Sequence, residues 1–163
     1  MPDPAVKVVS LAAAREAAAR ARAAGHRIVL ANGAFDMLHV GHVRYLADAR
    51  RHGDLLIVAV NSDVSARAIK GPQRPIVPEG ERVELLSHLD CVDLIVLFDE
   101  PTAAEVLRAV RPQVHAKGTD YTADTVPERE VVAEWGGETI ICGDPKDHAT
   151  TDLVAEILKR FSP

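Results

Sequence analysis

The 163-residue sequence has few cysteines and few aromatic residues, with two of the former and 4% of the latter. Cys91 and Cys142 lack the close pairing of a zinc knuckle or a CxxC redox motif, so we expect two buried, reduced thiols. Long apolar runs are also missing, because Arg15, Glu16 and Arg20 interrupt the alanine-rich stretch near the N-terminus. No segment approaches the roughly 20 apolar residues that span a bilayer, which predicts a cytoplasmic protein without a membrane partner.

An excess of basic residues is missing as well. Lys and Arg together number 19 against 24 Asp and Glu, which gives a formal net charge of -5. This balance argues against a nucleic-acid-binding face. It does not exclude a small anionic ligand, because a few local cations are enough to hold one. With 47% hydrophobic residues, the length suits one compact domain over residues 1–163.

Short apolar, β-branched runs alternate with helical stretches along the whole chain. The strands are expected at residues 27–32, 54–61, 92–98, 113–118 and 137–143. The helices are expected at residues 11–24, 41–51, 79–88, 102–110, 128–135 and from about 150 onward. Residues 62–78, rich in proline and basic residues, are expected to form an irregular loop. This alternation predicts an α/β fold, a Rossmann-like parallel sheet with helices on both faces, with ligands at the carboxyl ends of its strands.

His39 and His42 flank Gly41 at the point where a strand gives way to a helix. A zinc site favours i, i+4 spacing with a third ligand nearby, as in HExxH, and neither is present here. A purely structural pair is a second interpretation. The third fits the stretch best: free N–H groups at a helix N-terminus favour an anion, and imidazoles can donate to phosphate oxygens as charge builds on them. The stretch therefore suits phosphoryl or nucleotidyl transfer, with the other two interpretations left open.

Four blocks carry a family resemblance: "NGAFDMLHVGHVRYL", "KGPQRPIVPEGERVELLSHLDCVD", "KGTDY" and "HATTDLV". In this order they resemble the HxGH nucleotidyltransferase superfamily, which includes cytidylyltransferases, over residues 27–161. "VNSDVSARAIKGPQRPI", "KGTDYTADTVPE" and "WGGETIICGDPKDHATT" are most similar to the adenylyltransferases that act on D-glycero-β-D-manno-heptose 1-phosphate.

The resemblance implies a reaction and its partners. ATP and the heptose 1-phosphate would give ADP-heptose and pyrophosphate, a step toward lipopolysaccharide, in a homodimer. Mg²⁺ is expected to arrive with ATP, without a dedicated metal site made of protein ligands. Two alternatives stay open: a cytidylyltransferase for glycerol 3-phosphate or another small phosphate or phosphonate, and an inactive nucleotide-binding regulatory module.

The resemblance also implies residue roles. A sugar phosphate is already ionised near neutral pH, so alignment and charge stabilisation are needed rather than a strong base. The implied catalytic residues are His39, His42 and Lys70. The implied nucleotide-binding residues are Asn32, Gly33, Ala34, Phe35, His39, His42, Lys117, Gly118, Asp120, Tyr121, Lys146, Thr150 and Thr151. The implied acceptor-binding residues are Asp36, Arg44, Asp63 and Arg74.

Several of these positions carry a second interpretation. Asp36 either orients a neighbouring donor, which we favour, or binds a metal. Thr150 and Thr151 are expected to cap the last helix and to hold the β- and γ-phosphates. The family has Ser, often with Arg ahead of it, where this chain has His148 and Ala149, and Lys146 is expected to replace the missing cation. Arg82 is a further candidate for a phosphate contact, and His115 and Trp135 are expected to be packing residues.

Overall fold

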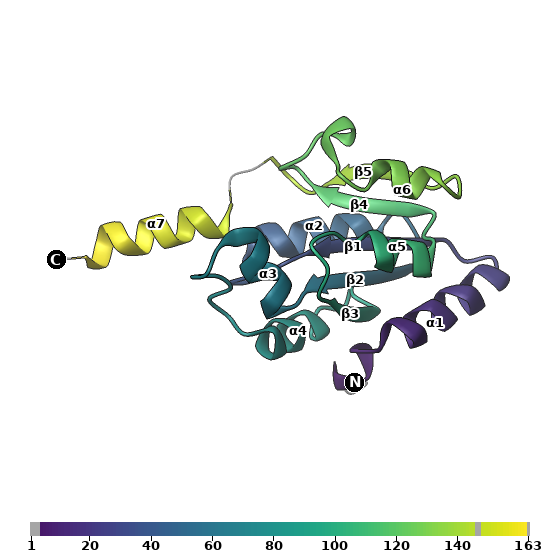
Figure 1. Cartoon of the computed structure of the whole chain (residues 1–163), viewed down its shortest axis with the longest axis horizontal. Helices are drawn as coiled ribbons and strands as arrows, with labels where there is room; N and C mark the ends of the chain where they lie inside the picture. The colour runs from purple at the N-terminus through teal and green to yellow at the C-terminus, as the bar shows by residue number, and fades with distance from the viewer. Residues whose placement is uncertain (1–3, 146–147, 163) are drawn as a thin grey trace.

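The computed structural model describes residues 4–145 and 148–162. Five parallel strands form one sheet in the order β3-β2-β1-β4-β5 (Figure 1). The strands are β1 (Ile28–Gly33), β2 (Leu55–Asn61), β3 (Leu94–Phe98), β4 (Val114–Gly118) and β5 (Glu138–Cys142). The predicted Rossmann-like parallel sheet is confirmed.

Helices cover both faces of the sheet, as predicted. On β1, Ile28 and Leu30 pack toward one helical layer, whereas Val29 and Ala31 pack toward the other. This alternation follows from the two-residue period of a strand. The first layer holds α1 (Leu11–Ala23), α5 (Ala104–Val110) and α6 (Arg129–Ala133). The second layer holds α2 (Val40–Arg50) and α4 (Glu79–Ser87). Two 3₁₀ turns lie at Pro4–Lys7 and Ala123–Thr125.

The prediction that residues 62–78 form an irregular loop is wrong for the first half of that stretch. It folds as helix α3 (Asp63–Lys70), in which the Ser62 hydroxyl accepts a hydrogen bond from the Ser65 N–H at 3.2 Å. Gly71 ends the helix with a φ of 98°. The prolines and glycine that follow dominate the local pattern and mask a short helix that buries few side chains.

The expectation of two buried thiols holds for Cys142 and is wrong for Cys91. Cys142 is buried at the end of β5, and Cys91 is half-buried before β3; both are free thiols. Among the described residues, no helix is long and apolar enough to cross a membrane.

The connections between strands determine at which end of the sheet a ligand site is expected. After β3, at one edge of the sheet, the chain crosses to β4 on the other side of β1. The strand order therefore reverses between β1 and β4, and α/β sheets bind ligands at the carboxyl ends of strands beside such a switch point. Helix α7 (Thr150–Phe161) begins at this end of the sheet and projects away from it (Figure 1).

Candidate active site

A cavity of about 590 Å³ lies at the carboxyl ends of the strands. The loops after β1, β3, β4 and β5, helix α3 and the start of α7 all contribute to its wall. Among the residues singled out from the sequence, those that line it are Asn32, Gly33, Ala34, Phe35, Asp36, His39, His42, Lys70, Arg74, Lys117, Gly118, Asp120, Tyr121, Thr150 and Thr151. Arg44 and Asp63 are not among the lining residues, and Lys146 lies outside the described residues.

The two histidines of the HxGH stretch occupy the first turn of α2. His39 is the N-cap, and its Nδ1 accepts a hydrogen bond from the Gly41 N–H at 3.1 Å. The Nδ1 of His42 accepts from the His39 N–H at 3.3 Å. Because each Nδ1 accepts a main-chain N–H, each neutral ring carries its proton at Nε2. The rings stack with centroids 3.9 Å apart, and both line the cavity.

Both imidazoles favour the neutral form. Burial, followed by the charges of His39 and Lys70, lowers the pKa of His42 to about 4. Burial, followed by His148, also lowers the pKa of His39. At neutral pH the site therefore presents uncharged Nε2–H donors rather than imidazolium ions.

Gly41 is required by close packing against His39. A Cβ at position 41 would lie 2.9 Å from Cε1 of the His39 ring and 3.2 Å from Cβ of His148. The absence of a Cβ at position 41 leaves room for the His39 ring, which the Gly41 N–H helps to orient.

The loop between β1 and α2 carries backbone strain. Phe35 and Met37 have φ values of 52° and 50°, in the left-handed region that non-glycine residues rarely adopt. The Phe35 ring meets His42 edge-on at 5.4 Å and stacks with Tyr45 at 6.3 Å between centroids. The strained turn thereby packs the Phe35 side chain against His42.

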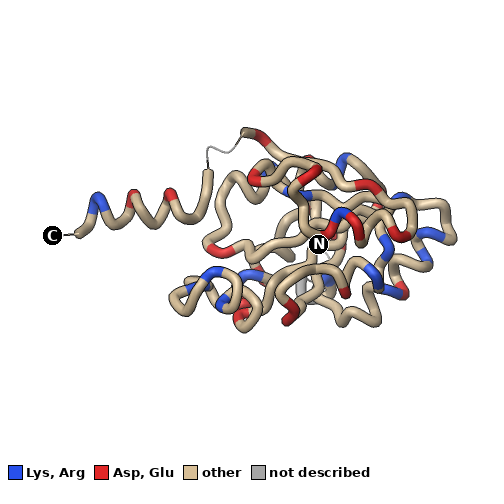
Figure 2. Tube along the Cα trace, turned by 45° about the horizontal axis from the view of Figure 1, so that its top comes forward, with Lys and Arg blue, Asp and Glu red and all other residues tan. Residues whose placement is uncertain are grey.

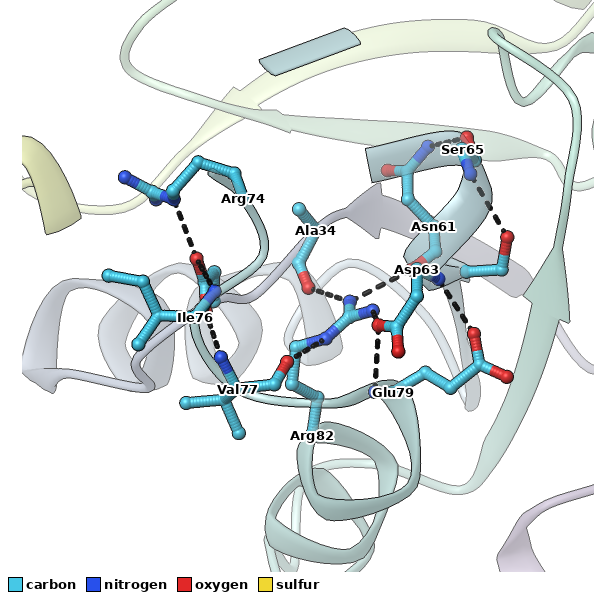
Figure 3. A network of polar contacts seen from close by, with 11 residues as sticks. Ala34, Asn61, Asp63, Ser65, Arg74, Ile76, Val77, Glu79 and Arg82 are labelled. Atoms are coloured by element: carbon cyan, nitrogen blue, oxygen red, sulfur yellow. Dashed lines mark hydrogen bonds and ion pairs between the residues drawn. The ribbon is translucent and has the colours of Figure 1, made fainter. Parts of the chain in front are cut away.

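Asp36 orients its neighbours, as we favoured from the sequence. Its buried carboxylate accepts from Arg74 Nε at 2.7 Å and from the N–H groups of Ile76 and Val77 at 2.9 Å each (Figure 3). Burial alone would raise the pKa of this carboxyl, but the hydrogen bonds from Val77, Ile76 and Arg74 outweigh it and lower the pKa. The carboxylate thus holds the segment after α3 against the loop after β1, with Arg74 at the cavity wall.

Arg82 is buried and does not line the cavity, so it stabilises the fold rather than contacting a phosphate. Arg82 is 1% exposed, and its guanidinium donates to the carbonyl oxygens of Ala34, Asn61 and Val77 (Figure 3). Asp63, expected to bind the acceptor, does not line the cavity: its carboxylate accepts from Arg82 at 2.9 Å and from the Glu79 N–H at 2.9 Å. These contacts tie the ends of β1 and β2 to the start of α4.

Arg44 and Thr150 also differ from expectation. Arg44 pairs with Asp144, half-exposed, and does not reach the cavity. The predicted side-chain cap of α7 is wrong: Ala149 is the N-cap, with no side-chain hydrogen bond. The Thr150 hydroxyl instead donates to the Asp36 carbonyl oxygen at 2.7 Å, which ties α7 to the loop after β1. Thr150 and Thr151 still line the cavity at the helix N-terminus, where anions are favoured.

Sequence reasoning missed several polar residues of the cavity wall. Asn61, Thr102, Thr119, Glu128, Asp144 and His148 line it as well. Asn61 ends β2, and Thr119 directly follows β4, so a strand-end position was the available signal. Trp135 packs as expected, and its Nε1 donates to the Pro112 carbonyl oxygen at 2.8 Å.

One group of metal-type ligands lies nearby. Ligand atoms of Asp48, His52 and Cys142 come within 4.8 Å of one another. Burial, followed by Asp48, raises the pKa of the Cys142 thiol to about 12, which keeps it protonated at neutral pH. Asp48 already accepts from the Gly143 N–H at 2.9 Å. The Asp48–Gly143 hydrogen bond thus holds the end of β5 against α2.

The fold and site together define a class of protein. One cavity at the end of a parallel sheet brings together paired imidazole donors, cationic side chains and a helix N-terminus. Enzymes that bind and transfer nucleotide phosphates use these groups. The cytidylyltransferase-like family matches residues 30–158 of the chain. The chain belongs to this family and is a nucleotidyltransferase.

Known proteins agree with this assignment. The chain is 44% identical over 147 residues to the bifunctional protein HldE of Trichlorobacter lovleyi, covering 90% of the chain and 30% of that protein. It is 46% identical over 140 residues to HldE of Geobacter sulfurreducens, covering 86% and 29% respectively. The chain thus spans about 30% of the length of these relatives.

A solved structure is similar as well. The lipopolysaccharide core biosynthesis protein from Thermoplasma volcanium matches with a TM-score of 0.64 and 30% sequence identity. The match covers 75% of this chain and all of that one.

Proposed function

We propose that the chain transfers the adenylyl group of ATP to D-glycero-β-D-manno-heptose 1-phosphate, giving ADP-heptose and pyrophosphate. One observation carries the proposal: two neutral imidazoles, each with Nδ1 held by the main chain, line one cavity with Lys70 and Arg74. The choice of substrates is supported by the resemblance of residues 60–76, 117–128 and 135–151 to heptose 1-phosphate adenylyltransferases. The similarity to a lipopolysaccharide core biosynthesis protein of Thermoplasma volcanium supports a place in lipopolysaccharide synthesis.

The geometry supports an in-line displacement at the α-phosphorus. An oxygen of the sugar phosphate forms the new bond to phosphorus, and the bond to the bridging oxygen breaks as pyrophosphate leaves with its electron pair. His39 and His42 donate from Nε2 to the non-bridging oxygens, where negative charge gathers. Lys70 and Arg74 balance charge on the phosphates, and the first N–H groups of α7, with the Thr151 hydroxyl, receive the β- and γ-phosphates.

Mg²⁺ fits this site as a companion of the nucleotide. Both carboxylate oxygens of Asp36 are engaged by Arg74, Ile76 and Val77, so this residue is not a ready ligand. The phosphate oxygens and water would hold most of the ion's coordination sites, as is common for Mg²⁺. When bound, it neutralises charge on the triphosphate.

We also propose that two copies pair through α7. Leu153, Ile157, Leu158 and Phe161 are between 41% and 79% exposed, and no residue of this helix is buried. Acidic residues come first along α7 and basic residues last (Figure 2). A two-fold axis perpendicular to the helices would lay two copies of α7 antiparallel, with the acidic start of one beside the basic end of the other. The helix is therefore complementary to itself in charge and in apolar surface.

The decisive experiment is a matrix of substrates. The protein is incubated with ATP or CTP, each with heptose 1-phosphate or glycerol 3-phosphate, and pyrophosphate release is measured. We expect turnover with ATP and heptose 1-phosphate. Turnover only with CTP would favour a cytidylyltransferase, and nucleotide binding without turnover on any acceptor would favour a regulatory module.

Because the reactants and products are polar metabolites, the proposed reaction also supports the cytoplasmic location expected from the sequence.

A further inference from the structure

A buried histidine stands directly behind the cavity wall. His115 lies on β4 with no exposed surface, and its Nε2 is 2.8 Å from the side-chain oxygen of Asn32 at the end of β1. Lys117 lies two residues further along β4, so its side chain leaves the same face of the sheet. The Lys117 Nζ is 3.5 Å from the same Asn32 oxygen. Asn32 itself lines the cavity.

These contacts decide where the hydrogens lie. A lysine ammonium only donates, so the Asn32 atom that it faces is the amide oxygen. An amide oxygen only accepts, so His115 must carry its proton at Nε2. With the oxygen held by two donors from β4, the Asn32 amide hydrogens are left to donate to another acceptor, and Asn32 lines the cavity.

A histidine at this position is costly for the fold. Burial, followed by the charge of Lys117, lowers the pKa of His115 to about 3, so the ring is neutral at pH 7. Its Nδ1 is buried and has no hydrogen-bond partner among the described residues. An unpaired buried polar atom destabilises the folded state, and a leucine at this position would avoid that cost. Folding alone therefore does not explain this side chain.

We propose that His115 is a positioning residue that holds the Asn32 carboxamide so that its N–H groups donate to a phosphate oxygen at the reacting centre. Asn32 is the group that touches substrate, and His115 acts through it. The inference rests on nucleotidyl transfer, the general activity, and not on the identity of the acceptor. It adds a role in positioning to the buried, packing place that the sequence suggested for His115.

The first test separates positioning from structure. Replacing His115→Leu removes the donor, and we expect kcat/KM to fall about tenfold, the value of one hydrogen bond. The thermal midpoint should stay equal or rise. His115→Gln keeps an N–H within reach of Asn32 and should return activity to within about threefold of the unchanged enzyme. Unchanged activity in His115→Leu, or a loss that follows a lower thermal midpoint, would overturn the proposal.

The second test addresses Asn32 itself. Asn32→Asp keeps an oxygen for His115 and Lys117 but turns the cavity-facing donor into an acceptor, so we expect kcat/KM to fall about 100- to 1,000-fold. The double variant Asn32→Ala with His115→Leu should be no worse than Asn32→Ala alone, because both residues act through one contact. Additive losses, or an Asn32→Asp enzyme near full activity, would contradict the proposal. A selective rise in KM for the nucleotide or for the acceptor identifies which phosphate Asn32 touches.

A third measurement does not depend on turnover. Nitrogen NMR of the unchanged protein should show His115 neutral, protonated at Nε2 and bare at Nδ1. The opposite tautomer would overturn the inference. If the unchanged enzyme fails with every nucleotide and acceptor while this tautomer is found, the proposed function fails and the orientation of Asn32 stands.

Discussion

At the scale of single residues, His39 and His42 combine two tasks. Each accepts a main-chain N–H at Nδ1 and so keeps Nε2 as the donor that faces the cavity. We expect His39→Ala and His42→Ala each to lower kcat about 100- to 1,000-fold, the cost of removing one transition-state donor. Pyrophosphate release at saturating substrate measures this. His26→Ala, at an exposed position outside the cavity, is the control. Full activity in both cavity variants would exclude the mechanism.

The pKa of His42 links stability to pH. Folding lowers this pKa from 6.5 to about 4. Between pH 6.5 and pH 4, His42 is therefore protonated in the unfolded chain and neutral in the folded chain. The free energy of unfolding should therefore fall as pH drops from about 6.5 to about 4, by no more than about 3 kcal/mol for this residue. Guanidinium unfolding at a series of pH values measures the slope. His42→Gln should reduce the slope and leave the contributions of His39 and His115, whose pKa values burial also lowers, whereas His26→Gln should not reduce it; equal slopes in the two variants would contradict the assignment.

At the scale of elements, the first turn of α2 depends on a glycine that a helix would otherwise disfavour. Gly41→Ala would place Cβ 2.9 Å from the His39 ring. We expect the ring to shift and kcat to fall about tenfold or more, since small misplacements of catalytic groups are costly. Steady-state kinetics tests this.

Gly80 on α4 is a matched control for Gly41. A Cβ there would meet nothing within 4 Å. Gly80→Ala should leave kcat unchanged and stabilise the protein by about 0.5–1 kcal/mol, because alanine loses less backbone entropy in a helix. Equal kinetic effects of the two replacements would show that the close contact with His39 is unimportant.

At the scale of the whole molecule, α7 carries the proposed dimer. Leu158 is 59% exposed on α7, and Leu85 is 47% exposed on α4. Leu158→Glu should convert a dimer into a monomer, because it places a charge in the apolar stripe, whereas Leu85→Glu should not. Sedimentation velocity distinguishes the two species. A monomer in the unchanged protein, or a dimer that survives Leu158→Glu, would refute pairing through this helix.

The sequence by itself determined the architecture and the centre of the site. Strands such as Leu55–Asn61 carry their signal in consecutive apolar residues, and parallel order follows from alternation with helices. His39 and His42 were recognisable as candidates because they lie within the first turn of α2, so their spacing is local.

Only the tertiary structure decided how the wall of the cavity is held. The Thr150 hydroxyl meets the Asp36 carbonyl across 114 positions of sequence, and His115 meets Asn32 across 83. Arg82 and Asp63, expected near substrate, pair with each other instead. Such contacts join side chains from separate strands and helices, and no local pattern encodes them, because they exist only once the sheet has brought its strand ends together.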